Sequence, residues 1–459
     1  MRKRCLPEKG SLSNSATDFS ITNYVQKPSF KEAFWFWLKL GFISFGGPAG
    51  QIAIMHEFLV DKKKWISNSR FLHALNYTMI LPGPEAQQLA TYTGWLLHGT
   101  KGGLTAGILF VLPSMFVLLL LTVLYVQFGN IPWVYAMFEG LKPAVLAIVL
   151  LALIKIGKNS LQTFFHYAAA LTAFICIFFF NISFPIIILT ALLVAFIVRK
   201  LYPNLFMHSQ KSKDQLIKDE SGYFINNEHK SIAHLRLPPL IMQAAAIIIL
   251  WFVPLVIFYA ADYDFVFWKQ LAFFFTQAAL VTFGGAYAVL PYVAQVSVEK
   301  LHWLSELQMI DGLALGETTP GPLVMVLVFV GFMAAYNNRN GSLVAGSFGL
   351  VTTAFYTFLP CFLFILVGAP IIEKTRDNKM IKEALSIVTA AVVGVVLNLT
   401  LFLGKAVIFP NEFIFSQIDF ISVTWITISF IAMYKFRIGM IPWIGISAAF
   451  GLMNFFISI

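Results

Sequence analysis

The chain carries the same interrupted hydrophobic segment twice. A Phe-Gly-Gly motif at 45–47 and a Pro-Gly-Pro motif at 82–84 recur at 283–285 and 320–322, each pair 238 residues apart. Glycine and proline at these points interrupt long apolar stretches that would otherwise form continuous helices. A duplicated hydrophobic unit with such interruptions is typical of a secondary transporter.

The composition indicates that lipid is the main solvent of this chain. Hydrophobic residues make up 58% of the 459 residues and charged residues only 12%. The segments 104–126, 240–261 and 343–372 contain no charged side chain, and each is longer than the roughly 20 residues that span a bilayer core. The sequence therefore predicts an all-α polytopic membrane protein. We attribute the net charge of +10 to cytoplasmic loops and reject nucleic-acid binding.

The hydrophobic pattern divides into thirteen elements that lie in two repeats. We expect them at 34–58, 71–97, 104–127, 133–154, 162–180, 184–198, 239–261, 268–290, 308–335, 343–372, 384–408, 418–434 and 438–458.

Four parts of the chain follow from these elements. We expect a polar cytoplasmic tail at 1–32, a first transporter repeat at 33–200, a polar cytoplasmic linker at 201–238, and a second repeat with one preceding span at 239–459.

The repeat extends beyond the motifs, and its spacing predicts that the second copy is inverted in the membrane. Pro113 recurs as Pro360, and the Gly-Lys pair at 157–158 recurs at 404–405. Seven elements separate equivalent points, and an odd number reverses the direction of the second copy. Lys and Arg predominate on the side of the amino terminus and the linker, which is therefore expected to be cytoplasmic in a multi-pass protein of the inner or plasma membrane.

One basic loop is an exception to the cytoplasmic location of Lys and Arg if all thirteen elements span the membrane. Lys62, Lys63, Lys64 and Arg70 would then lie outside the cell. If the interrupted elements enter and leave by one face as re-entrant hairpins, this loop returns to the cytoplasm and the acidic loop that contains Asp311 moves outside. The sequence leaves both versions open, and both keep the copies inverted.

The interrupted helices are the predicted substrate site. A broken helix exposes backbone groups that lipid cannot satisfy but a buried polar site can. Pro84 and Pro322 suit the first turn of a following half-helix, whose positive end favours an anion. Close helix packing at small residues is the alternative explanation. The predicted substrate-binding residues are Ser44, Phe45, Gly46, Gly47, Pro82, Gly83, Pro84, Glu85, Thr282, Phe283, Gly284, Gly285, Thr319, Pro320, Gly321 and Pro322.

The two copies differ in their ionisable residues. Glu85 follows the first Pro-Gly-Pro motif, whereas Leu323 follows the second. Glu85 has two interpretations that stay open, as the carrier of a coupling proton or as a partner of the helix dipole. Glu317 is interpreted as interfacial, and Lys142 either attracts an anion or extends its side chain to the membrane surface.

Nothing in the sequence predicts a metal site, a cofactor or catalytic residues. The three cysteines, Cys5, Cys176 and Cys361, lack the spacing of metal ligands, and the histidines show no such spacing either. We therefore do not expect an enzyme.

With these motifs, the chain resembles the chromate ion transporter family in its two-domain form. The resemblance covers roughly residues 30–200 and 265–410. It rests on residues Leu40–Gly50, Trp65, Phe71 and Leu81–Glu85 of the first half, and on Phe283–Gly285, Leu290, Pro291, Trp303, Leu304 and Gly312–Pro322 of the second. The chain departs from the family pattern at Gly50 and Gln51, where an alanine and a histidine are usual, and at Ala286, where a third glycine is usual.

The resemblance implies efflux of chromate, a tetrahedral dianion similar to sulfate. Proton coupling is compatible with this function but is not required. Transport of sulfate or another anion is the alternative, a membrane-embedded lipid-handling enzyme is a weaker one, and a homodimer stays open.

Overall fold

The computed structural model describes residues 27–45, 47–201, 222–226, 237–261, 264–372, 379–409 and 418–458. Almost all of the predicted amino-terminal tail and most of the predicted linker lie outside these residues, as does Gly46 of the first Phe-Gly-Gly motif. The described chain is helical, and its only strand-like feature is one isolated β-bridge. The predicted all-α fold is thus confirmed.

The helices fall into two series separated by one additional helix. The first series consists of α1 (Phe30–Ile43), α2 (Gly47–His56), the π-helix η1 (Glu57–Lys62), α3 (Asn68–Thr78), α4 (Glu85–Phe128), α5 (Pro132–Ser160), α6 (Phe164–Phe178) and α7 (Phe184–Leu201). After α8 (Leu237–Ala260) come α9 (Phe265–Val281), α10 (Ala286–Ala294), the π-helix η3 (Gln295–Lys300), α11 (Glu306–Thr318), α12 (Met325–Asn338), α13 (Leu343–Ile372), α14 (Lys379–Ile408), α15 (Phe420–Tyr434) and α16 (Met440–Ser458).

Six of these helices are long and apolar enough to cross a membrane: α4, α5, α8, α13, α14 and α16. The Phe-Gly-Gly and Pro-Gly-Pro motifs divide their elements into shorter helices, as their glycines and prolines predict. α4 is itself interrupted, because His98 and Gly99 have non-helical backbone angles. Its first part, from Glu85 to Leu97, is therefore a short helix that pairs with α3, and its second part is the long apolar span.

Local structure recurs between the two series with the same offset of 238 residues. The π-helix η1 corresponds to η3. Lys64 and His302, which follow them, both adopt left-handed backbone angles, with φ of 51° and 49°. Ser67 and Ser305 then cap α3 and α11 by accepting a hydrogen bond from the backbone three residues later.

The interrupted helices of the first series form hairpins whose ends meet at one place, which we call the first mouth. Lys63, after η1, forms an ion pair of 2.8 Å with Glu32 at the start of α1. His98 Nε2 lies 2.9 Å from the carbonyl oxygen of Pro28. The end of η1 and the end of the first part of α4 thus both lie near the start of α1.

A described piece of the linker also lies at the first mouth. Ile66 and Ile225 form a parallel β-bridge, and Ser67 N–H donates to Ile225 O at 2.8 Å. The basic loop at 62–64 is therefore on the same side of the molecule as the linker.

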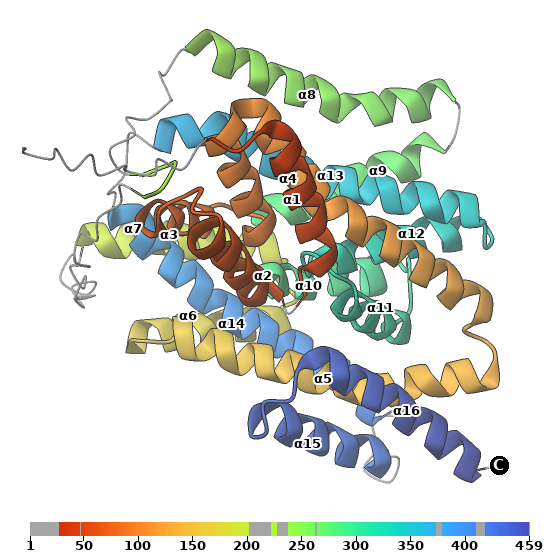
Figure 1. Cartoon of the computed structure of the whole chain (residues 1–459). Helices are drawn as coiled ribbons and strands as arrows, with labels where there is room; N and C mark the ends of the chain where they lie inside the picture. The colour runs from red at the N-terminus through yellow and green to blue at the C-terminus, as the bar shows by residue number, and fades with distance from the viewer. Residues whose placement is uncertain are drawn as a thin grey trace, which may run out of the picture.

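The hairpins of the second series end at a separate second mouth. Asn338 at the end of α12 donates to Asp264, which precedes α9, at 3.1 Å. Asn337 donates to the carbonyl oxygen of Trp303 at 2.7 Å, and Arg339 lies 3.5 Å from Asp264. Figure 1 shows α3 towards the left and α11 towards the right, with α2 and α10 near the middle.

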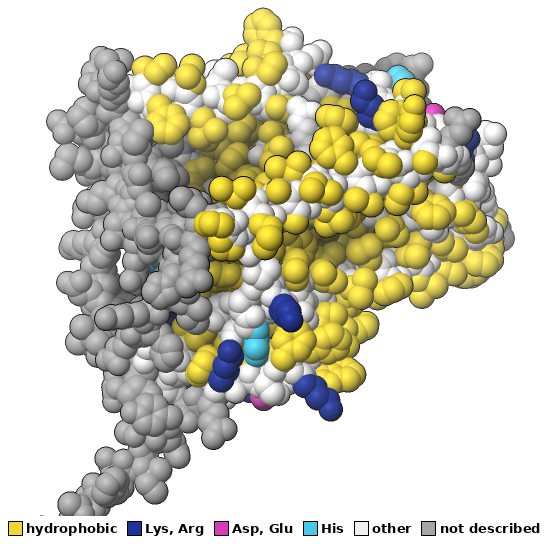
Figure 2. All heavy atoms as spheres, turned by 90° about the horizontal axis from the view of Figure 1, so that it is seen from above, with side chains coloured by type: hydrophobic (Ala, Val, Ile, Leu, Met, Phe, Trp, Pro, Cys, Tyr) yellow, Lys and Arg dark blue, Asp and Glu magenta, His cyan; other side chains and the backbone are white. Residues whose placement is uncertain are grey.

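The remaining helices interdigitate between the two series. α16 and α15 pack on α5, whereas α6 and α7 pack on α14. α8 lies at the edge of the molecule (Figure 1), with large apolar side chains such as Ile241, Ile249 and Phe252 exposed. From that side, hydrophobic side chains cover most of the described surface and Lys and Arg gather at its margins (Figure 2). This distribution is that of a surface in contact with lipid.

Candidate functional site

The interrupted segments of the two copies cross one another and exchange backbone hydrogen bonds. Gly83 N–H, in the first Pro-Gly-Pro motif, donates to Thr282 O of the second copy at 2.7 Å. Gly321 N–H, in the second Pro-Gly-Pro motif, donates to Ser44 O of the first copy, also at 2.7 Å. Each break thus satisfies backbone groups that the other leaves without a helical partner.

The glycines at this crossing are required by backbone conformation and by space. Gly83 and Gly321 have φ of 120° and 102°, a region that favours glycine. A Cβ on Gly83 would lie 2.7 Å from Cys361 Sγ, and a Cβ on Gly321 would overlap Ser114 Oγ. Ser114 Oγ also donates to the carbonyl oxygen of Pro320. Ser114 and Cys361 are themselves repeat partners, so each copy packs against the glycine of the other.

The Phe-Gly-Gly turns have left-handed glycines as well. φ is 68° at Gly47, 81° at Gly284 and 97° at Gly285. Phe45 and Phe283 are half-buried beside these turns. The prediction for Gly46 lies outside the described residues.

The hydroxyl groups predicted as anion donors are engaged with their own helices. Ser44 Oγ donates to Leu40 O and Thr282 Oγ1 to Ala278 O, both at 2.6 Å. Thr319 Oγ1 donates to Gly316 O at 2.9 Å. A hydroxyl proton would have to leave its carbonyl acceptor before it could bind an anion, so free backbone N–H groups at the helix starts are the readier donors.

The two Pro-Gly-Pro motifs lead into helices at different distances. α4 begins at Glu85, directly after Pro84, which is its N-cap. α12 begins at Met325, three residues after Pro322. The positive end of α4 therefore lies at the crossing with Glu85 in its first turn.

Glu85 faces the opposite copy. A Cβ on Gly285 would lie 3.9 Å from Glu85 Oε1, so the carboxyl group adjoins the second Phe-Gly-Gly turn. Glu317, by contrast, accepts a hydrogen bond of 2.6 Å from Tyr287 of α10 and is 9% exposed. The structure places Glu317 inside the protein rather than in the interfacial position that the sequence suggested.

Three buried glutamines also lie at the crossing. Gln87 and Gln88 were expected to add polar groups to the half-helix after Pro84, whereas Gln51 was not expected there. Gln51 Nε2 donates to Ser44 O at 3.3 Å and to Gly321 O, so it joins both copies. Gln88 Nε2 donates to Pro82 O at 2.6 Å, and Gln87 Nε2 donates to Thr91 Oγ1 at 3.2 Å. Their three side-chain carbonyl oxygens have no partner among the described residues.

Gln51 is one of the two positions where the first motif departs from the family pattern. This unusual residue type was the sequence feature that could have identified Gln51 as part of the site. From α2, its amide reaches Ser44, beside the first Phe-Gly-Gly motif, and Gly321 of the second Pro-Gly-Pro motif.

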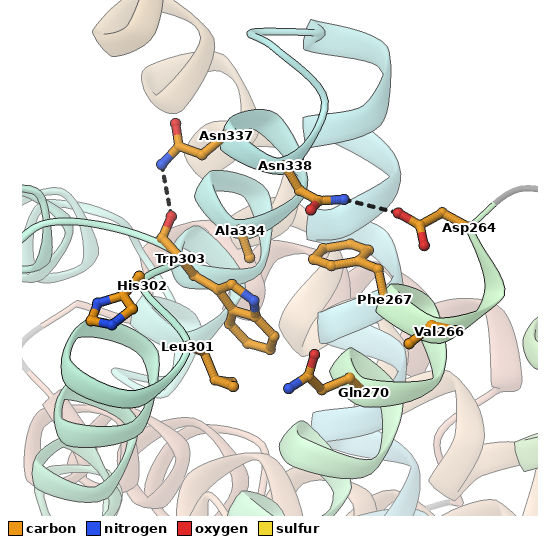
Figure 3. A pocket seen from close by; sticks show the side chains of 10 residues that line it. All are labelled: Asp264, Val266, Phe267, Gln270, Leu301, His302, Trp303, Ala334, Asn337 and Asn338. Atoms are coloured by element: carbon orange, nitrogen blue, oxygen red, sulfur yellow. Dashed lines mark hydrogen bonds between the residues drawn. The ribbon is translucent and has the colours of Figure 1, made fainter.

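A pocket of about 410 Å³ opens at the second mouth. Figure 3 shows Gln270, His302 and Trp303 around it, with the bond from Asn338 to Asp264 at one side. The residues of the first mouth that correspond to Gln270 and Leu301 are Glu32 and Lys63. The ion pair at the first mouth is thus replaced by uncharged residues at the second. Among the described residues, no cluster of three His, Cys, Asp or Glu side chains is arranged to hold a metal ion.

The long apolar helices and the crossed, interrupted hairpins define a multi-pass membrane transporter. The family model described as chromate transporter matches residues 31–197 and 269–452, and the chain belongs to this family. The resemblance found in the motifs is confirmed.

Curated relatives match over most of their length. A chromate transport protein of Pseudomonas aeruginosa is 30% identical over 85% of this chain and 84% of that protein. A probable chromate transport protein of Synechococcus elongatus is 28% identical over 82% and 85%, and a chromate transport protein of Cupriavidus metallidurans is 27% identical over 81% of each. No solved structure matches the chain.

Proposed function

We propose that the chain exports a small tetrahedral oxyanion, chromate first, through a site at the crossing of two inverted repeats. The observation that carries this proposal is the reciprocal pair of backbone bonds, from Gly83 to Thr282 and from Gly321 to Ser44. They bring both interrupted segments, and the start of α4, to one buried place. The names of the relatives support chromate as the substrate.

The proposed repeats keep the bounds 33–200 and 239–459, the second with one preceding span. The first mouth adjoins the linker and is cytoplasmic in this proposal, and the second mouth faces outward. The separate mouths and the positions of the linker and α8 support this arrangement.

The electrostatics of the site favour a weakly held anion. The backbone N–H groups at the start of α4 and the dipole of that helix attract negative charge. Glu85 partners the same helix end and repels a dianion, which aids release. Export of a dianion from a cell with a negative interior gains about 2.3 kcal/mol per charge for each 100 mV, so weak binding is compatible with efficient export.

The test is transport by the purified full chain in proteoliposomes loaded with labelled chromate. We expect an outward flux that sulfate inhibits less than unlabelled chromate does. A Gly285→Val variant should lose this flux because its side chain would enter the turn beside Glu85. Vesicles with the wild-type chain that release chromate no faster than empty vesicles would contradict the proposal. If sulfate inhibited the flux more strongly than unlabelled chromate does, the proposal of anion transport would stand, but sulfate would replace chromate as the proposed substrate.

A further inference from the structure

A partly buried cluster of charged and phenolic groups lies between α4, α5 and α11, and its Asp311 is about two helical turns before the end of α11. It consists of Tyr125, Tyr135, Glu139, Lys142 and Asp311, and we call it the Asp311 cluster. In the re-entrant version the sequence placed Asp311 in an external loop, but Asp311 lies in α11 and is 6% exposed. Tyr125 donates to Asp311 Oδ2 at 2.9 Å. Asp311 Oδ1 is buried and has no hydrogen-bond partner among the described residues.

Lys142 provides the positive charge of the cluster. It is 4% exposed, so its side chain does not extend to the surface, and it forms an ion pair with Glu139. Its ammonium lies 5.4 Å from the centre of the Tyr135 ring and is close enough to act electrostatically on Asp311. The Glu139 side chain is 45% exposed. The cluster thus connects the surface of α5 with the buried carboxylate of α11.

The corresponding positions of the other copy do not carry the same charged residues. The residues that correspond to Asp311, Glu139 and Lys142 in the other copy are His73, Ser386 and Thr389. The positions that carry Asp311, Glu139 and Lys142, each in one copy, thus hold a histidine and two hydroxyl residues in the other. A buried carboxylate oxygen without a donor costs about 1–3 kcal/mol or more, so Oδ1 of Asp311 is a place where a proton would be stabilising.

A proton site away from the anion is one way to exchange a dianion for protons, because proton and anion can then bind in different states of the transporter. A carboxyl group that shares a site with a dianion binds its proton together with the anion, because protonation removes their repulsion. Such coupling moves proton and anion in the same direction. Glu85 lies at the crossing and would share its site with the anion, whereas the Asp311 cluster would not.

The geometry points to Asp311 as the residue that binds the exchanged proton and thereby controls the contact of α11 with α5. This inference rests on the proposed function. In the ionised state, Asp311 attracts Lys142 and holds α11 against α5. When a proton binds to Oδ1, the carboxyl becomes neutral, the attraction is lost, and α11 with its Pro-Gly-Pro motif is free to move. Asp311 is thus a positioning residue that acts through α11.

A proton fits this place better than a metal ion does. Asp311 offers one unoccupied oxygen, and Lys142 already neutralises Glu139. The titratable groups that face Asp311 are Tyr125 from α4, and Tyr135, Glu139 and Lys142 from α5. The described parts of α12, α14, α15 and α16, which also contact α11 or α5, add no further group that acts on Asp311.

The functional test compares two modes of transport in proteoliposomes that hold the full chain. We expect Asp311→Asn to keep chromate–chromate exchange at equal pH but to lose the response to a pH gradient. In the wild type, a gradient of about one pH unit should change the final chromate ratio about tenfold per coupled proton, since tenfold corresponds to about 1.4 kcal/mol. An Asp311→Asn variant that responds to the gradient like the wild type would overturn the inference.

A second measurement is independent of chromate. Infrared spectroscopy of the purified protein at stepped pH should show a carboxylic C=O band that disappears in Asp311→Asn and persists, shifted, in Tyr125→Phe. The exposed carboxylate in Asp264→Asn is the matched control, and it should leave the band unchanged. An unchanged band in Asp311→Asn would refute the proton site. If the wild type failed to transport chromate at all, the proposed function would fail while this spectrum still decided the proton site.

Discussion

Single glycines hold the two copies together at the crossing. Gly83 and Gly321 combine left-handed backbone angles with contacts that leave no room for a methyl group. Gly47 has a left-handed angle too, but a Cβ there would meet no atom within 4 Å. The chain therefore offers positions at which strain and crowding can be separated.

Gly321→Ala should destabilise the protein by at least about 2 kcal/mol, because backbone strain and overpacking against Ser114 add. Gly47→Ala should cost only about 1 kcal/mol, from strain alone. Unfolding in mixed detergent micelles measures both. Adding Ser114→Ala should recover part of the Gly321→Ala loss, and equal losses for Gly321→Ala and Gly47→Ala would show that crowding is unimportant.

Glu85→Gln should strengthen chromate binding about tenfold, about 1.4 kcal/mol, because it removes a negative charge beside the predicted anion position and keeps the shape of the side chain. Equilibrium binding to purified protein measures this change. Glu57→Gln is the control, since Glu57 is an exposed acid paired with Lys62. Weaker binding in Glu85→Gln would place Glu85 in a different role.

The sequence predicted the motif residues at the crossing but not all of the polar groups around them. The motif residues were found because glycine and proline interrupt an apolar pattern and recur with a fixed offset. The partners of Gln51 and Glu317, Gly321 O and Tyr287, come from other segments of the chain, and Lys142 is buried where α5 lies against α11. Such contacts leave no trace in local sequence.

At the scale of elements, the two mouths differ although the same hairpins build them. Glu32 and Lys63 form an ion pair at the first mouth, and Gln270 and Leu301 stand in their places at the second, beside the pocket. The half-helices themselves were predicted from Gly and Pro. The π-helices η1 and η3 were not, because no residue pattern distinguishes them from an α-helical turn.

The Glu32–Lys63 pair should contribute little to stability. Both side chains are more than 40% exposed, and exposed pairs contribute about 0.2–1 kcal/mol. A double-mutant cycle with Glu32→Gln and Lys63→Met, followed by unfolding in micelles, should give a coupling energy in this range that decreases at high salt. A coupling energy of several kcal/mol would mean that the first mouth is closed by a desolvated pair.

At the scale of the whole molecule, the repeats determine the architecture. The thirteen predicted elements all contain helices at the expected places, because apolar runs of bilayer length leave few alternatives. The sequence left open whether the interrupted elements span or re-enter, because only the basic loop at 62–64 distinguished the two versions. The contacts at each mouth, with Lys63 at Glu32 and Asn338 at Asp264, favour re-entrant hairpins.

The inverted arrangement of the two copies is best tested at one pair of equivalent residues. Lys64 and His302 occupy the same left-handed position after η1 and η3. In a chain whose native cysteines are replaced, Lys64→Cys and His302→Cys can be labelled in intact cells with a membrane-impermeant thiol reagent. We predict that His302→Cys reacts from outside and that Lys64→Cys reacts only after the membrane is opened. Labelling of both residues from the same side would contradict the inverted repeats.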